Sequence, residues 1–138
     1  FAMMVPQFLS LTQRMIHHPV RIPPLQKGTG MVYRKCRLRN GMDFPLAGVV
    51  AAVNIKGKAI SDFRLRLTGV SSSPVVVAKA GEIAGGKRLG LDLIASLADA
   101  SYAVAHPAEN LEANARRRRS MVRVMTEGIL AGIANGLA

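Results

Sequence analysis

The sequence predicts an α+β domain in which a three- to four-stranded antiparallel sheet packs against about three helices. Strand-like patterns occupy the first half of the chain and helical patterns the second half. This order is typical of an antiparallel sheet whose helices are segregated to one face. The chain has 138 residues, 49% of them hydrophobic, which is enough for one domain with its own core.

The strongest strand pattern is an antiparallel hairpin over residues 46–68. Its first arm is nearly all apolar, which favours a strand covered on both faces. A short turn at residues 56–58 leads into the second arm, where alternation places Phe63, Leu65 and Leu67 on the core side. The arginines between them are therefore expected to face away from the core.

Residues 31–39 are predicted to form another strand before this hairpin. The preceding residues, 1–30, contain prolines and glycines that interrupt regular structure. We therefore expect a partly irregular segment that leads into a domain spanning residues 31–138. Because side chains alternate along an extended strand, each face has its own set. One face carries Val32, Arg34, Cys36 and Leu38, and the other, strongly cationic face carries Tyr33, Lys35, Arg37 and Arg39.

Helical spacing is present over residues 91–104 and again over residues 111–137. In the second of these segments, Gly128, Gly132 and Gly136 form a row. Because glycine costs a helix about 1 kcal/mol relative to alanine, the row predicts that something packs closely against it. The apolar stripe of the same helix consists of Val122, Met125, Ile129 and Ile133.

The valine segment between the hairpin and the helices has two interpretations. Consecutive valines from Val75 onwards have β propensity. The residues that follow favour a helix, in which Pro74 would occupy the first turn and Ser73 would be the cap. Local propensity leaves both alternatives open.

Composition narrows the functional classes. The net charge is +11, from 19 Lys and Arg against 8 Asp and Glu, which favours nucleic acid, a membrane surface or an acidic partner. Aromatic residues make up 4% and tryptophan is absent, so platforms for stacking single-stranded nucleic acid are scarce. No uncharged apolar stretch reaches the length of about 18 residues that spans a membrane. One cysteine, Cys36, excludes an intrachain disulfide and suits a reducing cytoplasm.

Local motifs supply no catalytic chemistry. Residues 81–88, GEIAGGKR, have the spacing of a phosphate-binding loop, but Arg88 stands where a Ser or Thr would bind Mg²⁺. A Gly-rich connection between helices is therefore the better interpretation. The arginines at residues 116–119 point around the whole helix and are interpreted as a solvated face with partner contacts. The histidines lack companions at metal-ligand spacing. The residues alone thus indicate a binding or structural domain.

Short motifs follow one another along the first half of the chain. They are VRIPP at residues 20–24, GTG at 28–30, YRKCRLR at 33–39, MDFPL at 42–46, LTGV at 67–70 and SPV at 73–75. With the arginine-bearing last helix, they resemble the C-terminal domain of the flavoprotein subunits of molybdenum hydroxylases. That family includes CO dehydrogenase, 4-hydroxybenzoyl-CoA reductase and xanthine dehydrogenase. Ala115 departs from the pattern, because the family usually has a tyrosine before its arginines.

The resemblance implies a small antiparallel sheet backed by three helices, with a helix at Val75. It also implies FAD, held mainly by preceding FAD-binding domains whose Gly-rich segments nothing in residues 1–19 matches, so we expect a piece of a longer subunit. Lys35 would lie near the pyrimidine end of the isoalloxazine ring. From the strand pattern, Tyr33 shares the face of Lys35 and is expected to cover the ring, and Arg37 is the third expected cofactor-binding residue. The implied partners are an iron–sulfur subunit and a large molybdopterin subunit, which carries out the substrate chemistry.

Two other functions are alternatives: a basic nucleic-acid-binding module, and a structural or assembly domain without cofactor contact. The net charge of +11 fits the redox domain and the nucleic-acid module equally. The scarcity of aromatic residues counts against single-strand binding, so nucleic acid is not the expected partner.

Overall fold

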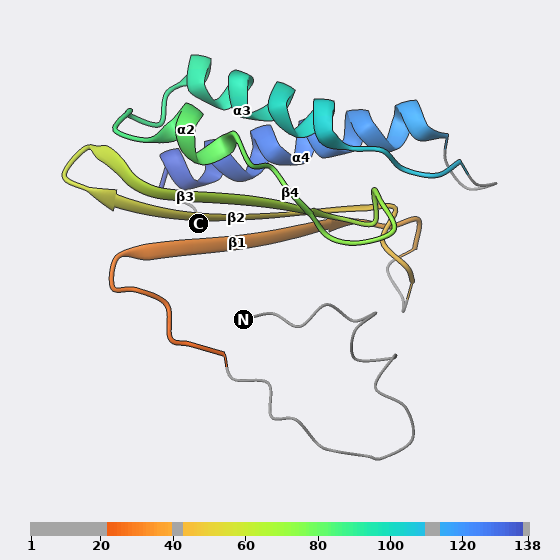
Figure 1. Ribbon diagram of the computed structural model, residues 1–138, viewed down its shortest axis with the longest axis horizontal. Coiled ribbons are helices and arrows are strands. Elements are labelled where there is room, and N and C mark those ends of the chain that lie inside the picture. The colour runs from red at the N-terminus through yellow and green to blue at the C-terminus, as the bar shows by residue number, and fades with distance from the viewer. Residues whose placement is uncertain (1–21, 40–42, 110–113, 137–138) are drawn as a thin grey trace.

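The strands of the sheet pair in chain order. The computed structural model describes residues 22–39, 43–109 and 114–136, so most of the predicted leading segment, residues 1–21, lies outside the described residues. Within them, a four-stranded antiparallel sheet forms one layer and three helices form a second layer over one of its faces (Figure 1), which confirms the predicted class. The elements are β1 (Thr29–Cys36), β2 (Ala47–Lys56), β3 (Ala59–Thr68), β4 (Val75–Val76), α2 (Ala80–Ala84), α3 (Leu91–Val104) and α4 (Ala115–Ala134).

The hairpin predicted over residues 46–68 is the centre of the fold. β2 and β3 pair antiparallel and turn at Gly57, whose φ of 65° is a left-handed conformation that glycine adopts without strain. Their inward side chains pack against the helices, with Leu97 of α3 and with Ile129 and Leu130 of α4. The buried residues of the hairpin include Val49, Ala51, Val53, Phe63, Leu65 and Leu67, so the predicted core side is confirmed.

β1 ends earlier than predicted. Its range is Thr29–Cys36, so the strand does not reach Arg39. The Cys36 carbonyl accepts a hydrogen bond of 2.8 Å from the backbone N–H of Leu46, and the chain is already turning towards β2 at this point. Arg37 and Arg39 therefore lie beyond the strand, where its alternation no longer fixes the direction of their side chains.

One expectation about the fold is wrong: the valine segment is a strand and not the start of a helix. Val75–Val76 form β4 and pair with the edge of β3. The N–H of Val77 extends this contact by donating to the Leu65 carbonyl at 3.0 Å, and α2 begins only at Ala80. The edge of β3 offers unpaired backbone groups, and β-branched valines fit a pleated surface. Pairing therefore outweighs the local helix signal of Pro74.

The last helix confirms the prediction with shorter bounds. Asn114 caps α4 through its side-chain oxygen, which accepts a backbone N–H hydrogen bond of 2.8 Å, so the helix begins after this residue and not at residue 111. A Cβ atom at Gly128 would lie 3.3 Å from Nη1 of Arg34, whereas a Cβ at Gly132 would meet nothing within 4 Å. Of these two helical glycines, only Gly128 has the close neighbour that the glycine row predicted.

Candidate functional site

The two faces of the sheet differ in what covers them. The helices lie over one face, and no helix of the described residues lies over the other, which we call the outer face (Figure 1). In the middle of β2, the side chains on the outer face are small, from Gly48, Val50 and Ala52, and they lie between β1 and β3. In register, the rows across this face are Met31, Ala52 and Arg64; Tyr33, Val50 and Arg66; and Lys35, Gly48 and Thr68.

Tyr33 supplies the aromatic ring of the outer face. It pairs with Val50 of β2, and its ring extends diagonally towards Gly48. A Cβ atom at position 48 would lie 3.2 Å from both Cε2 and the hydroxyl oxygen of Tyr33. The ring therefore lies low over the Gly48 backbone, while half of the residue, 50%, is exposed.

Lys35 lies in the row next to Tyr33, as the sequence predicted. It pairs with Gly48 and is exposed, and no salt bridge to it is found among the described residues. Strand alternation puts its side chain on the same face as the Tyr33 ring. Arg37, the third predicted site residue, follows the end of β1, so the sheet itself does not bring it to this face.

Two residues of the outer face were missed in the sequence. Arg66 is exposed and shares the row of Tyr33, and Thr68 shares the row of Lys35. Thr68 Oγ1 is buried and has no hydrogen-bond partner among the described residues. The alternation of the second hairpin arm already pointed both residues outward. What the sequence lacked was the register of β1 against the hairpin, which makes them neighbours of the predicted site.

The arginines of α4 have separate roles. Arg118 is buried at 9% exposure, and its guanidinium donates to the carbonyls of Leu46, Ala108 and Gly69 at 2.8, 2.9 and 2.7 Å. The guanidinium carbon of Arg119 lies 4.2 Å from the centre of the Tyr102 ring, and its Nε donates to the Tyr102 carbonyl at 3.1 Å. The interpretation of all four arginines as a solvated face is therefore wrong for these two. Arg116 and Arg117 are exposed.

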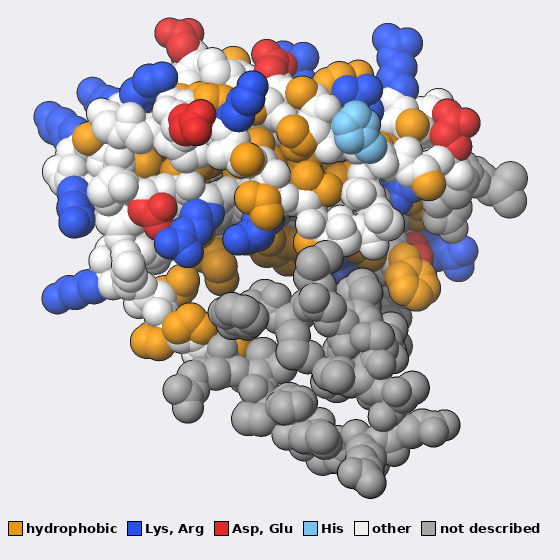
Figure 2. Space-filling model, in the orientation of Figure 1, with side chains coloured by type: hydrophobic (Ala, Val, Ile, Leu, Met, Phe, Trp, Pro, Cys, Tyr) orange, Lys and Arg blue, Asp and Glu red, His pale blue; other side chains and the backbone are white. Residues whose placement is uncertain are grey.

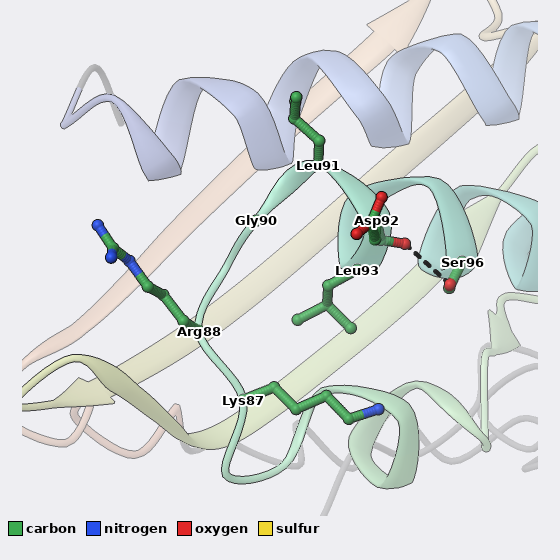
Figure 3. Close-up of a pocket in the computed structure, with 7 residues that line it drawn as sticks. All are labelled: Lys87, Arg88, Gly90, Leu91, Asp92, Leu93 and Ser96. Carbon is green, nitrogen blue, oxygen red and sulfur yellow. Dashed lines mark hydrogen bonds between the residues drawn. The ribbon is translucent and has the colours of Figure 1, made fainter.

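Residues 81–88 form most of α2 and the connection to α3. The N–H groups of Gly85, Gly86 and Lys87 already donate to backbone carbonyls at 2.9, 2.9 and 3.1 Å, so they do not form a free phosphate cradle. The pocket at the start of α3, of about 300 Å³, has Lys87 and Arg88 extending in different directions (Figure 3). This geometry supports the interpretation of the segment as a connection between helices.

Metal and membrane chemistry find no support in the described part of the chain. No group of three or more His, Cys, Asp or Glu residues there is placed to hold a metal ion, and His17 and His18 lie outside that part. None of its helices is long and apolar enough to cross a membrane. Cys36 is a free, half-buried thiol that lines an apolar groove under α4 with Met121 and Met125.

Comparison with known proteins decides the family. The family model of the CO dehydrogenase flavoprotein C-terminal domain matches residues 31–132. The chain belongs to this family. The CO dehydrogenase medium chain of Hydrogenophaga pseudoflava is 29% identical over 113 residues, covering 80% of this chain and 38% of the relative. The glyceraldehyde dehydrogenase medium chain of Sulfolobus acidocaldarius is 31% identical over 103 residues, covering 75% of this chain and 36% of the relative.

Solved structures support the assignment to the CO dehydrogenase flavoprotein C-terminal domain family. The structure of H. pseudoflava CO dehydrogenase lacking the Mo-pyranopterin moiety matches with a TM-score of 0.73 and 28% identity, over 78% of this chain and 37% of that one. Quinoline 2-oxidoreductase from Pseudomonas putida 86 matches with a TM-score of 0.72 at 18% identity, which concerns the fold alone. The chain thus spans less than two fifths of the relatives named here.

Proposed function

We propose that this domain closes one side of the flavin site in the FAD subunit of a molybdenum-containing hydroxylase or dehydrogenase, and docks that subunit onto its partners. The observation that carries the proposal is the outer face, which no helix of the described residues covers and on which the Tyr33 ring lies with the exposed cations Lys35 and Arg66. The relatives are medium chains of dehydrogenases, which supports a subunit of a larger assembly. An iron–sulfur subunit and a large molybdopterin subunit are the proposed partners.

The outer face fits a flavin in shape and charge. The half-exposed Tyr33 ring offers one flat surface to a planar ligand, and stacked aromatic pairs are favourable by about 0.5–1.5 kcal/mol beyond burial. Lys35 and Arg66 are exposed cations on either side of the small β2 residues. A reduced flavin carries negative charge near its pyrimidine ring, so cations here complement it. The residues present therefore fit the isoalloxazine end of FAD.

Each residue has a defined task in this proposal. FAD, when bound, accepts electrons and passes them on. Tyr33 covers the ring and excludes water from one side of it. Lys35 stabilises negative charge at the pyrimidine end, and Arg37 adds a contact from the loop after β1. The phosphates and the adenine are assigned to the preceding FAD-binding domains.

The proposed compartment is the reducing cytoplasm, because the chain has one cysteine.

The proposal is tested by the redox potential of the flavin in an FAD subunit that carries this domain. Lys35→Ala should lower the two-electron potential by about 30 mV, which corresponds to about 1.4 kcal/mol. That value is well within the roughly 4 kcal/mol for unit charges about 4 Å apart at an effective dielectric near 20, before desolvation losses. The fold should be retained, because Lys35 is exposed on the outer face.

Lys58→Ala is the matched control for this titration. It removes the same charge at the hairpin turn, beyond the opposite end of the sheet from Lys35. Its potential should equal that of the wild type. An unchanged potential in Lys35→Ala, or an equal fall in both variants, would remove Lys35 from the flavin site and leave the domain with docking alone.

A further inference from the structure

We propose that Gly48 and Thr68 are positioning residues that seat the ring of Tyr33 on the outer face. The idea rests on the proposed function for its purpose, because a seated ring presents one face to a planar ligand. Gly48 provides the space into which the ring lies down. The Thr68 hydroxyl borders the same space from the opposite strand.

A glycine inside a central strand needs a local reason. Gly48 lies in β2, which has neighbours on both sides, and glycine weakens a strand interior relative to alanine. Such glycines mark sites where another group approaches the backbone closely. Aromatic side chains of a neighbouring strand are known to cover strand glycines, and diagonal pairs lie within their reach.

The neighbours of Gly48 identify that group. A Cβ atom added there would collide with Thr68 Oγ1 and would lie 3.2 Å from two atoms of the Tyr33 ring. Gly30, on β1, gives the contrast, because a Cβ added there would meet nothing within 4 Å. Of these two strand glycines, only Gly48 is approached closely, and the approaching atoms belong to side chains of both flanking strands.

Thr68 places an unpaired polar group beside the Tyr33 seat. Its hydroxyl oxygen is buried without a hydrogen-bond partner among the described residues, although buried hydroxyls nearly always have one. Leaving such a group unpaired destabilises the folded state. The Tyr33 hydroxyl and the Thr68 hydroxyl both lie near the position that a Cβ atom of residue 48 would occupy. A side chain at position 48 would displace the ring outward, into the space that a stacked ligand needs.

The experiment uses the 138-residue chain without flavin and reports on the ring directly. In the wild type, NMR should show cross-peaks from the Tyr33 ring protons to Gly48 Hα and to the Thr68 methyl group. These cross-peaks should weaken in Gly48→Ala and disappear in Gly48→Val, in which the branched side chain fills the seat. Gly30→Ala should leave them unchanged, and the Tyr102 signals should remain the same in every variant.

A second measurement covers the case in which Gly48→Val does not fold. In a double-mutant cycle, Gly48→Ala should destabilise the wild type more than it destabilises Tyr33→Ala, because the ring is then absent. The cycle of Gly30→Ala with Tyr33→Ala should show additivity. The proposal would be overturned by the absence of these cross-peaks in the wild type, or by additive stability effects of Gly48→Ala and Tyr33→Ala. Because no flavin is present, this result is independent of the Lys35 titration, and either proposal can fail while the other stands.

Discussion

The guanidinium of Arg118 joins three loops at one end of the sheet. Its carbonyl partners precede β2, follow β3 and lie in the connection between α3 and α4. Each loop therefore has one of its backbone acceptors satisfied by a side chain of α4. A planar fork with several donors suits this task, and the point charge of a lysine does not.

Replacement of Arg118 should destabilise the fold strongly. Arg118→Met leaves three backbone carbonyls without their donor, and we expect a loss of about 3 kcal/mol in the free energy of unfolding. Arg118→Lys should lose nearly as much. Arg116→Met removes the same charge from the same turn at an exposed position and should change stability by no more than about 0.5 kcal/mol. Urea unfolding compares the variants, and equal losses at both positions would exclude the anchoring role.

The predicted apolar stripe already held a signal that separates these arginines, because Arg118 lies four residues before Val122 and therefore on the same helix face. The carbonyls that accept from its guanidinium come from loops distant in sequence, and the helix pattern does not encode them. Tyr33 and Lys35 were placed on one face correctly, since alternation along one strand is a local property. Arg66 joins them only through the register of three strands, which a single strand does not encode.

At the scale of elements, α4 covers the core and also carries glycines, which weaken the helix. Gly132→Ala should stabilise the domain by about 1 kcal/mol, because a Cβ there meets nothing within 4 Å and alanine favours the helix. Gly128→Ala should gain less, because its Cβ lies 3.3 Å from Arg34 Nη1 and the guanidinium must move. Thermal unfolding of the two variants tests the order, and an equal gain would show that Arg34 does not press on the helix.

The elements were predictable where pattern and context agree. The hairpin was correct in its turn and in the inward residues of its second arm, where alternation and the turn signal point to the same structure. The first arm was expected to be covered on both faces, but the described helices cover only one face of the sheet. The valine segment was wrong because its state depends on a partner. Val75–Val76 become a strand through the free edge of β3, which lies seven residues or more away in sequence and is invisible to local propensity.

At the scale of the whole molecule, positive charge is spread over the surface. Lys and Arg side chains lie over much of the visible part of the described chain and outnumber the Asp and Glu side chains between them (Figure 2). Some are paired, as Arg123 is with Asp99 and Glu127 at 3.1 and 3.4 Å. Exposed pairs of this kind stabilise a protein by no more than about 1 kcal/mol. The charge therefore acts mainly as a general attraction for acidic partners.

This distribution leads to an expectation about nucleic acid, the main alternative to the flavin role. Scattered cations bind phosphates by releasing counterions, so any binding should be non-specific and should weaken steeply with salt. Arg116→Ala with Arg117→Ala should reduce the slope of log affinity against log salt by at most about 2, one unit for each lost phosphate contact. Fluorescence anisotropy with two unrelated duplexes measures the affinity and its dependence on salt.

The other two arginines of that run are not available to contact bases, because Arg118 is buried and Arg119 is stacked on Tyr102. Tight binding of one duplex over the other at physiological salt, abolished by the double variant, would favour the nucleic-acid module over the flavin domain.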